Sequence, residues 1–113
     1  MNWLDHEYLV PVIIGNDREA IKAAKALYKV THIDAHLFAE SFSFLQKLSF
    51  NCHSVDPMRD EFLLESLLAF ANNYEDYYFP VIIVRECNKS FVERYSDAIE
   101  AAYVTVNVSE LLN

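Results

Sequence analysis

Residues 9–17 read LVPVIIGND, an apolar run followed by the only glycine of the chain and two polar residues. An apolar run of this length predicts a strand covered on both faces. Gly15 marks the turn after it, because glycine adopts the backbone angles of tight turns at little cost. Asp17 can cap a helix over residues 18–28, whose apolar positions form one stripe. Strand, turn and helix in this order are typical of the first unit of an α/β domain.

The rest of the chain repeats this alternation. Further strands are expected over residues 31–38, 50–55, 79–84 and 102–106, and further helices over residues 42–48, 57–72 and 90–100. Asp56 and Pro57 combine a capping carboxylate with a proline at the first helical position. We expect a three-layer, Rossmann-like α/β fold with a five-stranded, mostly parallel sheet in the order 3-2-1-4-5 and helices on both faces.

Length and composition indicate one domain over residues 1–113. The chain is 53% apolar, with eight phenylalanines and seven tyrosines, which predicts a packed core. No apolar run approaches the roughly 20 residues needed to cross a bilayer, so we expect no membrane partner. The first residues are acidic where a signal peptide would be basic, and we therefore expect a cytoplasmic protein.

Charge and cysteine content narrow the function classes further. The net charge of -8 would repel a phosphate backbone, so nucleic acid is not expected as a partner. Cys52 and Cys87 are too few for a disulfide framework, and the expected topology separates them, so both are predicted to be thiols.

A single glycine also excludes the common phosphate-binding motifs. A dinucleotide fingerprint needs about three glycines, and a P-loop needs at least two glycines with a lysine and a Ser or Thr. Neither pattern is present. The sequence therefore says much about the fold and little about chemistry.

Four segments resemble parts of one family. They are residues 11–17, similar to an opening strand with a Gly-x-Asp turn, residues 62–71, similar to the helix after the third strand, residues 82–96, similar to the fourth strand with its loop and helix, and residues 103–112, similar to the fifth strand and the passage that follows. In this pattern the chain from about Leu9 onward resembles the pre-ATP-grasp domain, the Rossmann-like N-terminal domain of ATP-grasp carboxylate-amine ligases. Within them it looks most like the group of D-aspartate ligase and carbamoyl-phosphate synthetase.

The resemblance implies a module that is not catalytic alone. No cofactor is expected in this chain, since ATP and Mg²⁺ would bind ATP-grasp lobes that act as partners in cis or in trans; a homodimer is a further possibility. Residues 1–8 would be an N-terminal extension, and residues 107–113 would begin a connection to an ATP-grasp lobe.

The resemblance also implies where a carboxylate substrate would lie. The loops after the first and fourth strands face the cleft in such ligases, and the matching residues are Gly15, Asn16, Asp17, Arg85 and Glu86. Two departures put these contacts in question. The turn has no second small residue beside Gly15, and residues 85–89 read RECNK where the family tends to have small residues before an acidic one.

Both loops also have simpler interpretations. The turn at residues 15–17 is either an anion seat at a helix N-terminus or only a turn in which Asp17 caps the helix. Arg85 and Glu86 follow a buried strand at the edge where open α/β folds bind ligands, or they are a solvated loop pair.

No catalytic or metal-binding residue is predicted. His32 and His36, four apart on the expected strand, would stand roughly 13 Å apart, too far to share one ion. Cys52 and His53 would point to opposite faces of their strand, so they do not form a nucleophile and base. Trp3 could pack on a neighbouring molecule or on the chain's own core.

Three other functions compete with the ligase module. A degenerate response-regulator receiver would use Asp56 as its phosphoacceptor, but it would also need an acidic pair after the first strand and a lysine after the fifth, which are absent. A stand-alone dimerising interaction module needs no catalytic group. A small hydrolase or transferase of flavodoxin-like fold would need a nucleophile and a base that the sequence does not offer.

Overall fold

The computed structural model describes residues 3–112 and contains the expected five-stranded sheet. Every strand pair is parallel. The strands are β1 (Leu9–Ile14), β2 (His36–Ala39), β3 (Asn51–Ser54), β4 (Phe79–Val84) and β5 (Val104–Asn107). Their spatial order is β3-β2-β1-β4-β5, which confirms the predicted fold class and strand order.

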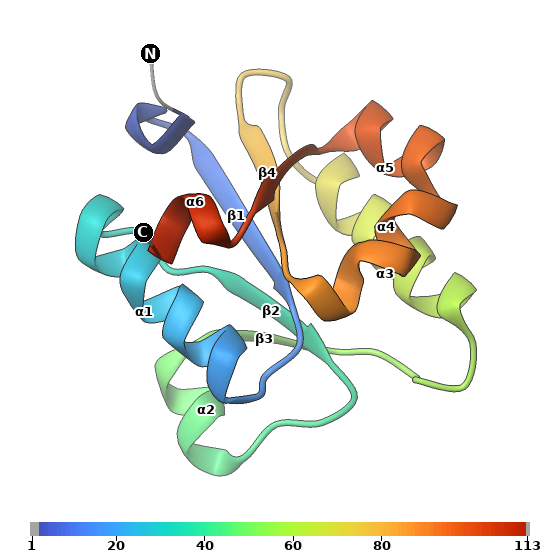
Figure 1. The fold of residues 1–113 in the computed structure, drawn as a ribbon, viewed down its shortest axis with the longest axis horizontal. Coiled ribbons are helices and arrows are strands. Elements are labelled where there is room, and N and C mark those ends of the chain that lie inside the picture. The colour runs from blue at the N-terminus through green and yellow to red at the C-terminus, as the bar shows by residue number, and fades with distance from the viewer. Residues whose placement is uncertain (1–2, 113) are drawn as a thin grey trace.

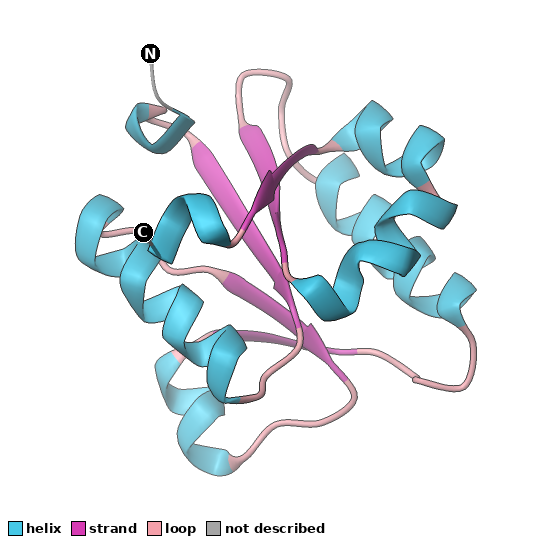
Figure 2. Ribbon diagram, in the orientation of Figure 1, coloured by secondary structure: helices cyan, strands magenta, loops and turns pink. Residues whose placement is uncertain are grey.

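Helices cover both faces of this sheet, giving three layers (Figures 1 and 2). One face carries α1 (Arg18–Thr31), α2 (Phe44–Ser49) and α6 (Ser109–Leu112). The other carries α3 (Asp60–Asn72), α4 (Lys89–Arg94) and α5 (Ser96–Ala102). Two short 3₁₀ turns complete the chain, η1 (Trp3–Asp5) and η2 (Glu86–Asn88).

The core consists of two apolar clusters separated by the sheet. Side chains alternate between faces along a strand, so β1 sends Ile13 into the cluster beneath α1 and Val12 into the cluster beneath α3 and α5. In β4, Ile83 and Ile82 divide in the same way. All four of these side chains are fully buried. This is why the two central strands are apolar at consecutive positions.

The strand order creates a switch point between β1 and β4. From β1 the chain runs outward through β2 to β3, whereas from β4 it runs the other way to β5. The loops at the carboxyl ends of β1 and β4 therefore diverge to opposite faces of the sheet. In open α/β sheets this divergence leaves a crevice in which ligands bind.

Several predicted boundaries are wrong around the first crossover. The first helix extends to Thr31, and β2 begins only at His36, so His32 is not on a strand. His32 ends α1 instead, with a left-handed backbone (φ 60°) whose N–H donates to the carbonyl of Tyr28. The expectation that His32 and His36 lie on one face of the same strand is therefore wrong.

The second half of the chain shows two further differences. Asp56 does not cap α3; its carboxylate accepts a hydrogen bond from the Met58 N–H (2.9 Å) in a turn, and the helix begins at Asp60. The helix predicted over residues 90–100 is two helices, because the backbone leaves helical geometry at Tyr95 (φ -112°, ψ 28°).

Both ends of the described chain pack on the α1 side of the core. Trp3 and Leu4 lie against that cluster, so these two residues of the N-terminal extension cover the chain's own core. Near the other end, Val108 and Leu111 pack against the same cluster. Most of the predicted connection at residues 107–113 therefore folds back as α6 beside α1 (Figure 1), while Asn113 lies outside the described residues.

A buried hydrogen bond links Tyr103, the C-cap residue of α5, to α3. The Tyr103 hydroxyl donates to the carbonyl of Leu67 (2.6 Å), and burial raises the pKa of Tyr103. Tyr103→Phe is expected to lower the free energy of unfolding by about 1 kcal/mol, because the lost bond is neutral and the ring keeps its packing. Urea unfolding followed by circular dichroism measures this loss. A loss above about 3 kcal/mol would show that the hydroxyl has a larger role than this one bond.

Candidate functional site

Arg85 lies at the switch point, directly after β4, and is almost completely buried. Its relative exposure is 4%, whereas the neighbouring Glu86 and Cys87 are exposed. A buried arginine is rare because its charge cannot be lost and must be paired. The solvated-loop interpretation is therefore wrong for Arg85.

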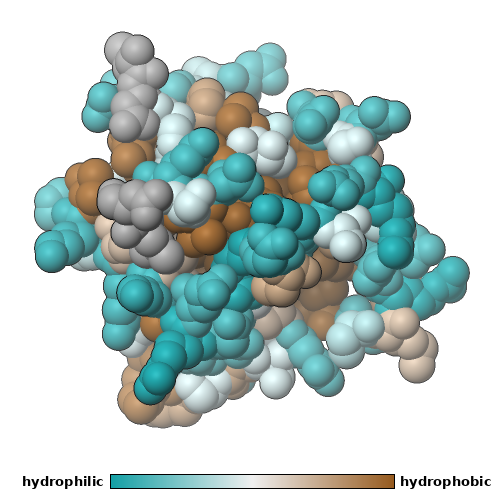
Figure 3. Space-filling view, viewed as in Figure 1, coloured by the Kyte–Doolittle hydropathy of each residue, from teal (hydrophilic) through white to brown (hydrophobic). Residues whose placement is uncertain are grey.

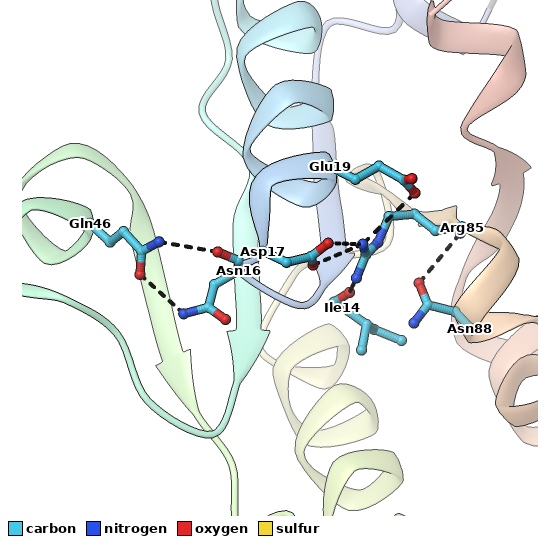
Figure 4. A network of polar contacts seen from close by, with 7 residues as sticks. All are labelled: Ile14, Asn16, Asp17, Glu19, Gln46, Arg85 and Asn88. Carbon is cyan, nitrogen blue, oxygen red and sulfur yellow. Dashed lines mark hydrogen bonds and ion pairs between the residues drawn. The ribbon is translucent and has the colours of Figure 1, made fainter.

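The guanidinium of Arg85 spans the crevice from β4 to the end of β1. Nη2 donates to the carbonyl of Ile14 (2.7 Å), and Nη1 lies 2.8 Å from both carboxylate oxygens of Asp17. Glu19 stands farther off, with Oε1 3.8 Å from Nη1 (Figure 4). Nε is buried and has no hydrogen-bond partner among residues 3–112. The side chain thus occupies the place where a ligand would lie in an open crevice.

Gly15 makes room for this arrangement. Its φ is +119°, which side chains of L residues rarely adopt, and its N–H donates to the carbonyl of Phe38 (2.7 Å). A Cβ atom added at Gly15 would overlap Nη2 of Arg85 and stand 3.1 Å from Oδ1 of Asp17. The chain's only glycine is therefore required twice, by its backbone angle and by the guanidinium beside it.

Asp17 occupies the N-cap position of α1 without capping it. Its carboxylate makes no hydrogen bond to the helix backbone and turns to Arg85 instead. The predicted cap is thus correct in position and wrong in its bonding. The free backbone amides at the N-terminus of α1 lie beside the Asp17 carboxylate, which is already paired with Arg85. The structure therefore does not support an anion-binding site at this helix N-terminus.

Asn16 belongs to a different network, on the α2 side of the loop. Its Nδ2 donates to the carbonyl of Ser41 (2.7 Å) and to Oε1 of Gln46 (3.0 Å), and Nε2 of Gln46 donates back to the carbonyl of Asn16 (3.1 Å). Gln46 in turn forms a capping box with Ser43 at the start of α2. Figure 4 shows Asn16 and Gln46 on one side of the loop and Arg85 on the other.

The β4 loop is also held by contacts within the protein. Asn88 Oδ1 accepts a hydrogen bond from the Arg85 N–H (3.3 Å), and the Asn88 N–H donates to the Arg85 carbonyl (2.9 Å). Glu86 points away and forms an exposed ion pair with Lys89 (2.8 Å). Among the five predicted substrate-binding residues, Gly15, Asp17 and Arg85 meet, whereas Asn16 and Glu86 lie apart from them.

Three participants were not predicted: Glu19, Gln46 and Asn88. The spacing of Ser43 and Gln46 is that of a capping box, so the start of α2 had a readable signal. The contacts of Glu19 and Asn88 with Arg85 depend on the meeting of distant segments, for which the sequence offers no local signal.

The arrangement is a closed switch point rather than a reactive centre. The Asp17 carboxylate and the Asn16 amide are both engaged by protein groups, and both Nη atoms of the guanidinium are paired. No group of three His, Cys, Asp or Glu within residues 3–112 is placed to hold a metal ion. The positive charge of Arg85 holds the loop after β4 against the loop after β1.

The chain matches no known family, no curated protein and no solved structure. The closed switch point must therefore be interpreted from its own chemistry. Within the described residues, none of the helices has both the length and the apolar character to cross a membrane.

A second polar cluster lies on β2 and β3, away from the switch point. Nδ1 of His36 is 3.0 Å from Nε2 of His53, so one ring donates and the other must accept. His53 stacks on Phe38 (ring centroids 4.5 Å apart), and Phe70 of α3 packs against both histidines. The partner of His36 is thus the histidine on the neighbouring strand, which sequence spacing alone did not indicate.

Burial controls the ionisation of this pair. Desolvation, assisted by the nearby His53, lowers the pKa of His36 to about 4, although Asp34 acts in the opposite direction. Desolvation also lowers the pKa of His53. Both rings are therefore neutral near pH 7. The cluster holds two imidazoles with no third ligand group among the described residues, and we assign no metal to it.

The two cysteines are free thiols, as predicted. Cys52 is partly buried, and burial raises the pKa of its thiol despite the opposing charge of Lys47. Cys87 is exposed in η2, close in sequence to Arg85. Within residues 3–112, neither thiol is hydrogen-bonded to a histidine; the Cys52 thiol lies 3.5 Å from the carbonyls of Gln46 and Phe50.

Proposed function

We propose that this chain is the non-catalytic, N-terminal module of an ATP-grasp carboxylate-amine ligase, and that it acts in the cytoplasm beside ATP-grasp lobes in cis or in trans. The observation that carries the proposal is the closed switch point. A domain whose crevice is filled by its own Arg85 has no room there for a nucleotide, yet it presents two loops in a fixed relation at one sheet edge. Such an edge suits a neighbouring lobe that binds the nucleotide.

The substrate side of this proposal centres on Arg85. A carboxylate substrate could exchange with Asp17 at Nη1 of Arg85, because Asp17 is half exposed and a guanidinium N–H pairs with any carboxylate. Asn16 and Glu86 are left out of this role, since their side chains are directed to Gln46 and Lys89.

The receiver alternative conflicts with the strand order. Receivers have the order 2-1-3-4-5, in which the third strand lies next to the first. Here β3 is the edge strand and β4 pairs with β1, so Asp56 stands two strands away from the loop that holds Asp17. Asp56 also accepts a hydrogen bond within its own turn. This geometry does not gather the acidic groups that a receiver needs around one Mg²⁺.

A stand-alone interaction module is the second candidate. It is favoured by the apolar residues that α2 leaves exposed, because large side chains clustered at a surface mark contact sites. The two candidates differ in which surface meets the partner. The ligase module would use the carboxyl edge of the sheet, whereas the interaction module would use α2.

Crosslinking from Cys87 tests the ligase module. Cys87 is exposed beside Arg85, and in a Cys52→Ser background a photoreactive group on Cys87 would mark whatever docks on the carboxyl edge. In cells we expect crosslinks to ATP-grasp lobes. The matched control is Tyr77→Cys in a Cys52→Ser/Cys87→Ser background, because Tyr77 is exposed just before β4, at the opposite edge of the sheet.

A nucleotide-binding measurement completes this test. Ligands that bind only the folded state raise Tm. Because the proposed module has no nucleotide site of its own, millimolar Mg·ATP is expected to leave the Tm of the isolated protein unchanged. A saturable rise in Tm would contradict a module without its own nucleotide site. Crosslinks from Cys87 only to proteins that lack ATP-grasp lobes would contradict the proposed partner.

A further inference from the structure

The charges of this acidic protein are unevenly distributed. Nine residues are Lys or Arg, and five of them lie on α1 and α2: Arg18, Lys22, Lys25, Lys29 and Lys47. All five side chains are exposed, and within residues 3–112 none of them forms an ion pair. Glu19 is the only acidic residue of these two helices, and it is directed to Arg85. This face is therefore positive on a chain with a net charge of -8.

Exposed apolar side chains accompany these cations. Phe44, Leu45 and Leu48 of α2 are 74%, 73% and 69% exposed, more than any other large apolar residue in the described chain except Met58. Figure 3 shows hydrophobic atoms at the lower left, over the position of α2, next to hydrophilic atoms. Leaving three large apolar side chains in water on one short helix is costly unless something covers them.

A groove lies between α1 and α2. Its volume is about 520 Å³, and it is lined by Arg18, Ile21, Lys22 and Lys25 of α1 and by Asn16 and Gln46. A second hollow of about 280 Å³ shares Lys25 with it and is also lined by Tyr28, Phe50 and one carboxylate, that of Asp34. The hydrogen bonds between Asn16 and Gln46 hold together the part of the groove lining that these two residues form. The groove thus presents three cations of α1 and one apolar side chain, Ile21, while the exposed apolar side chains of α2 lie outside its lining.

The charge pattern indicates what covers this face. A second copy related by a twofold axis would place the same cations against each other, which is unfavourable. A flat anionic membrane would meet the cations and the apolar residues, but it would not fill a groove with a preformed wall. A narrow protein segment that carries carboxylates and apolar side chains would pair with the cations, cover the exposed apolar side chains and fit the groove.

We infer that the α1–α2 face, formed by Arg18, Lys22, Lys25, Lys47, Phe44, Leu45 and Leu48, is a docking surface for an acidic segment of a partner protein that bears apolar anchors. The inference does not depend on the ligase module, whose partner would lie at the carboxyl edge. The apolar anchors would cover α2 while the carboxylates would pair with the cations of α1. Binding is expected to weaken as salt rises, because the cations are exposed.

Selection from a random peptide library displayed on phage tests this inference without a known partner. The immobilised full-length protein is expected to enrich peptides that combine several Asp or Glu with Leu, Phe or Trp. The affinity of synthetic copies of these peptides is then measured by fluorescence anisotropy against matched pairs of variants.

The charge pair is Lys22→Glu/Lys25→Glu against Arg59→Glu/Lys89→Glu, which makes the same change in net charge on other surfaces. The apolar pair is Leu45→Ser/Leu48→Ser against Met58→Ser, which is exposed elsewhere. The first member of each pair is expected to weaken binding by about tenfold or more, equivalent to about 1.4 kcal/mol. The controls are expected to leave it within about twofold. Unchanged far-ultraviolet circular dichroism shows that each variant is folded.

Three outcomes would overturn the inference. Enriched peptides could be neutral or basic, or binding could respond equally to the control variants. The third is binding to vesicles of phosphatidylserine without binding to any acidic peptide, which would identify a membrane surface instead. If acidic peptides bind at the α1–α2 face but Cys87 forms no crosslink to an ATP-grasp lobe, the docking surface is supported and the ligase proposal is not. The two proposals can therefore fail separately.

Discussion

Gly15→Ala is expected to lower the free energy of unfolding by about 3 kcal/mol. One part of the loss is backbone strain, since an L residue at φ +119° costs roughly 1–3 kcal/mol. The other part is displacement of Arg85, because the new Cβ would overlap Nη2 and break the bond to the Ile14 carbonyl. Urea unfolding followed by circular dichroism measures the loss as a change in midpoint at constant m-value.

A double-mutant cycle with Arg85→Met separates these two parts. Methionine fills the space of the arginine stem without the guanidinium, and Asp17 is half exposed, so its charge returns to water at little cost. In the Arg85→Met background, Gly15→Ala should lose only the strain part and cost about 1–2 kcal/mol less. Additive effects would mean that glycine is required by its backbone angle alone.

Acidification from pH 7.5 to pH 5 is expected to destabilise the protein through His36. The unfolded-state pKa of histidine is about 6.5 and the folded-state pKa of His36 is about 4, so the folded state prefers the neutral ring. The contribution of His36 is complete above pH 6.5 and is lost as the pH falls toward 4. The loss from pH 7.5 to pH 5 is about 2 kcal/mol, and His53 adds to it in the same direction.

Denaturant unfolding at these two pH values, with matched histidine variants, checks this expectation. His36→Gln should remove most of the pH dependence over this range. His32→Asn is the control, because His32 is exposed and asparagine tolerates its left-handed backbone. An equal pH dependence in His36→Gln and in the unaltered protein would show that the loss arises from other groups. Proton NMR titration of the ring signals gives the folded-state pKa directly.

The parallel sheet and its central strands were predictable because they depend on apolar patterns along the chain, whereas the same alternation of strands and helices fits more than one strand order. Consecutive apolar residues in 9–14 and 79–84 identified the two central strands, and β4 has the predicted bounds. Short or interrupted elements were harder to place. Residues 31–38 contain β-branched residues that favour a strand, yet tertiary packing extends α1 to Thr31 and delays β2 to His36.

The position of the candidate site was predicted from the sequence, but the burial of Arg85 that closes it was not. Gly15, Asp17 and Arg85 were named because of their positions after two strands, and they meet as the topology requires. That Arg85 is buried could not be predicted, because arginine is usually exposed and its burial depends on a carbonyl and a carboxylate about 70 residues away. The pair of His36 and His53 depends in the same way on strand register.

The contact between Gly15 and Arg85 also carries information for comparing related chains. A side chain at position 15 and an arginine at position 85 exclude each other. A related protein that keeps Arg85 should therefore also keep Gly15. A relative with a small residue in place of Arg85 would have an empty crevice, available to a ligand. These two positions together form a sequence signature that separates relatives with a filled crevice from relatives with an open one.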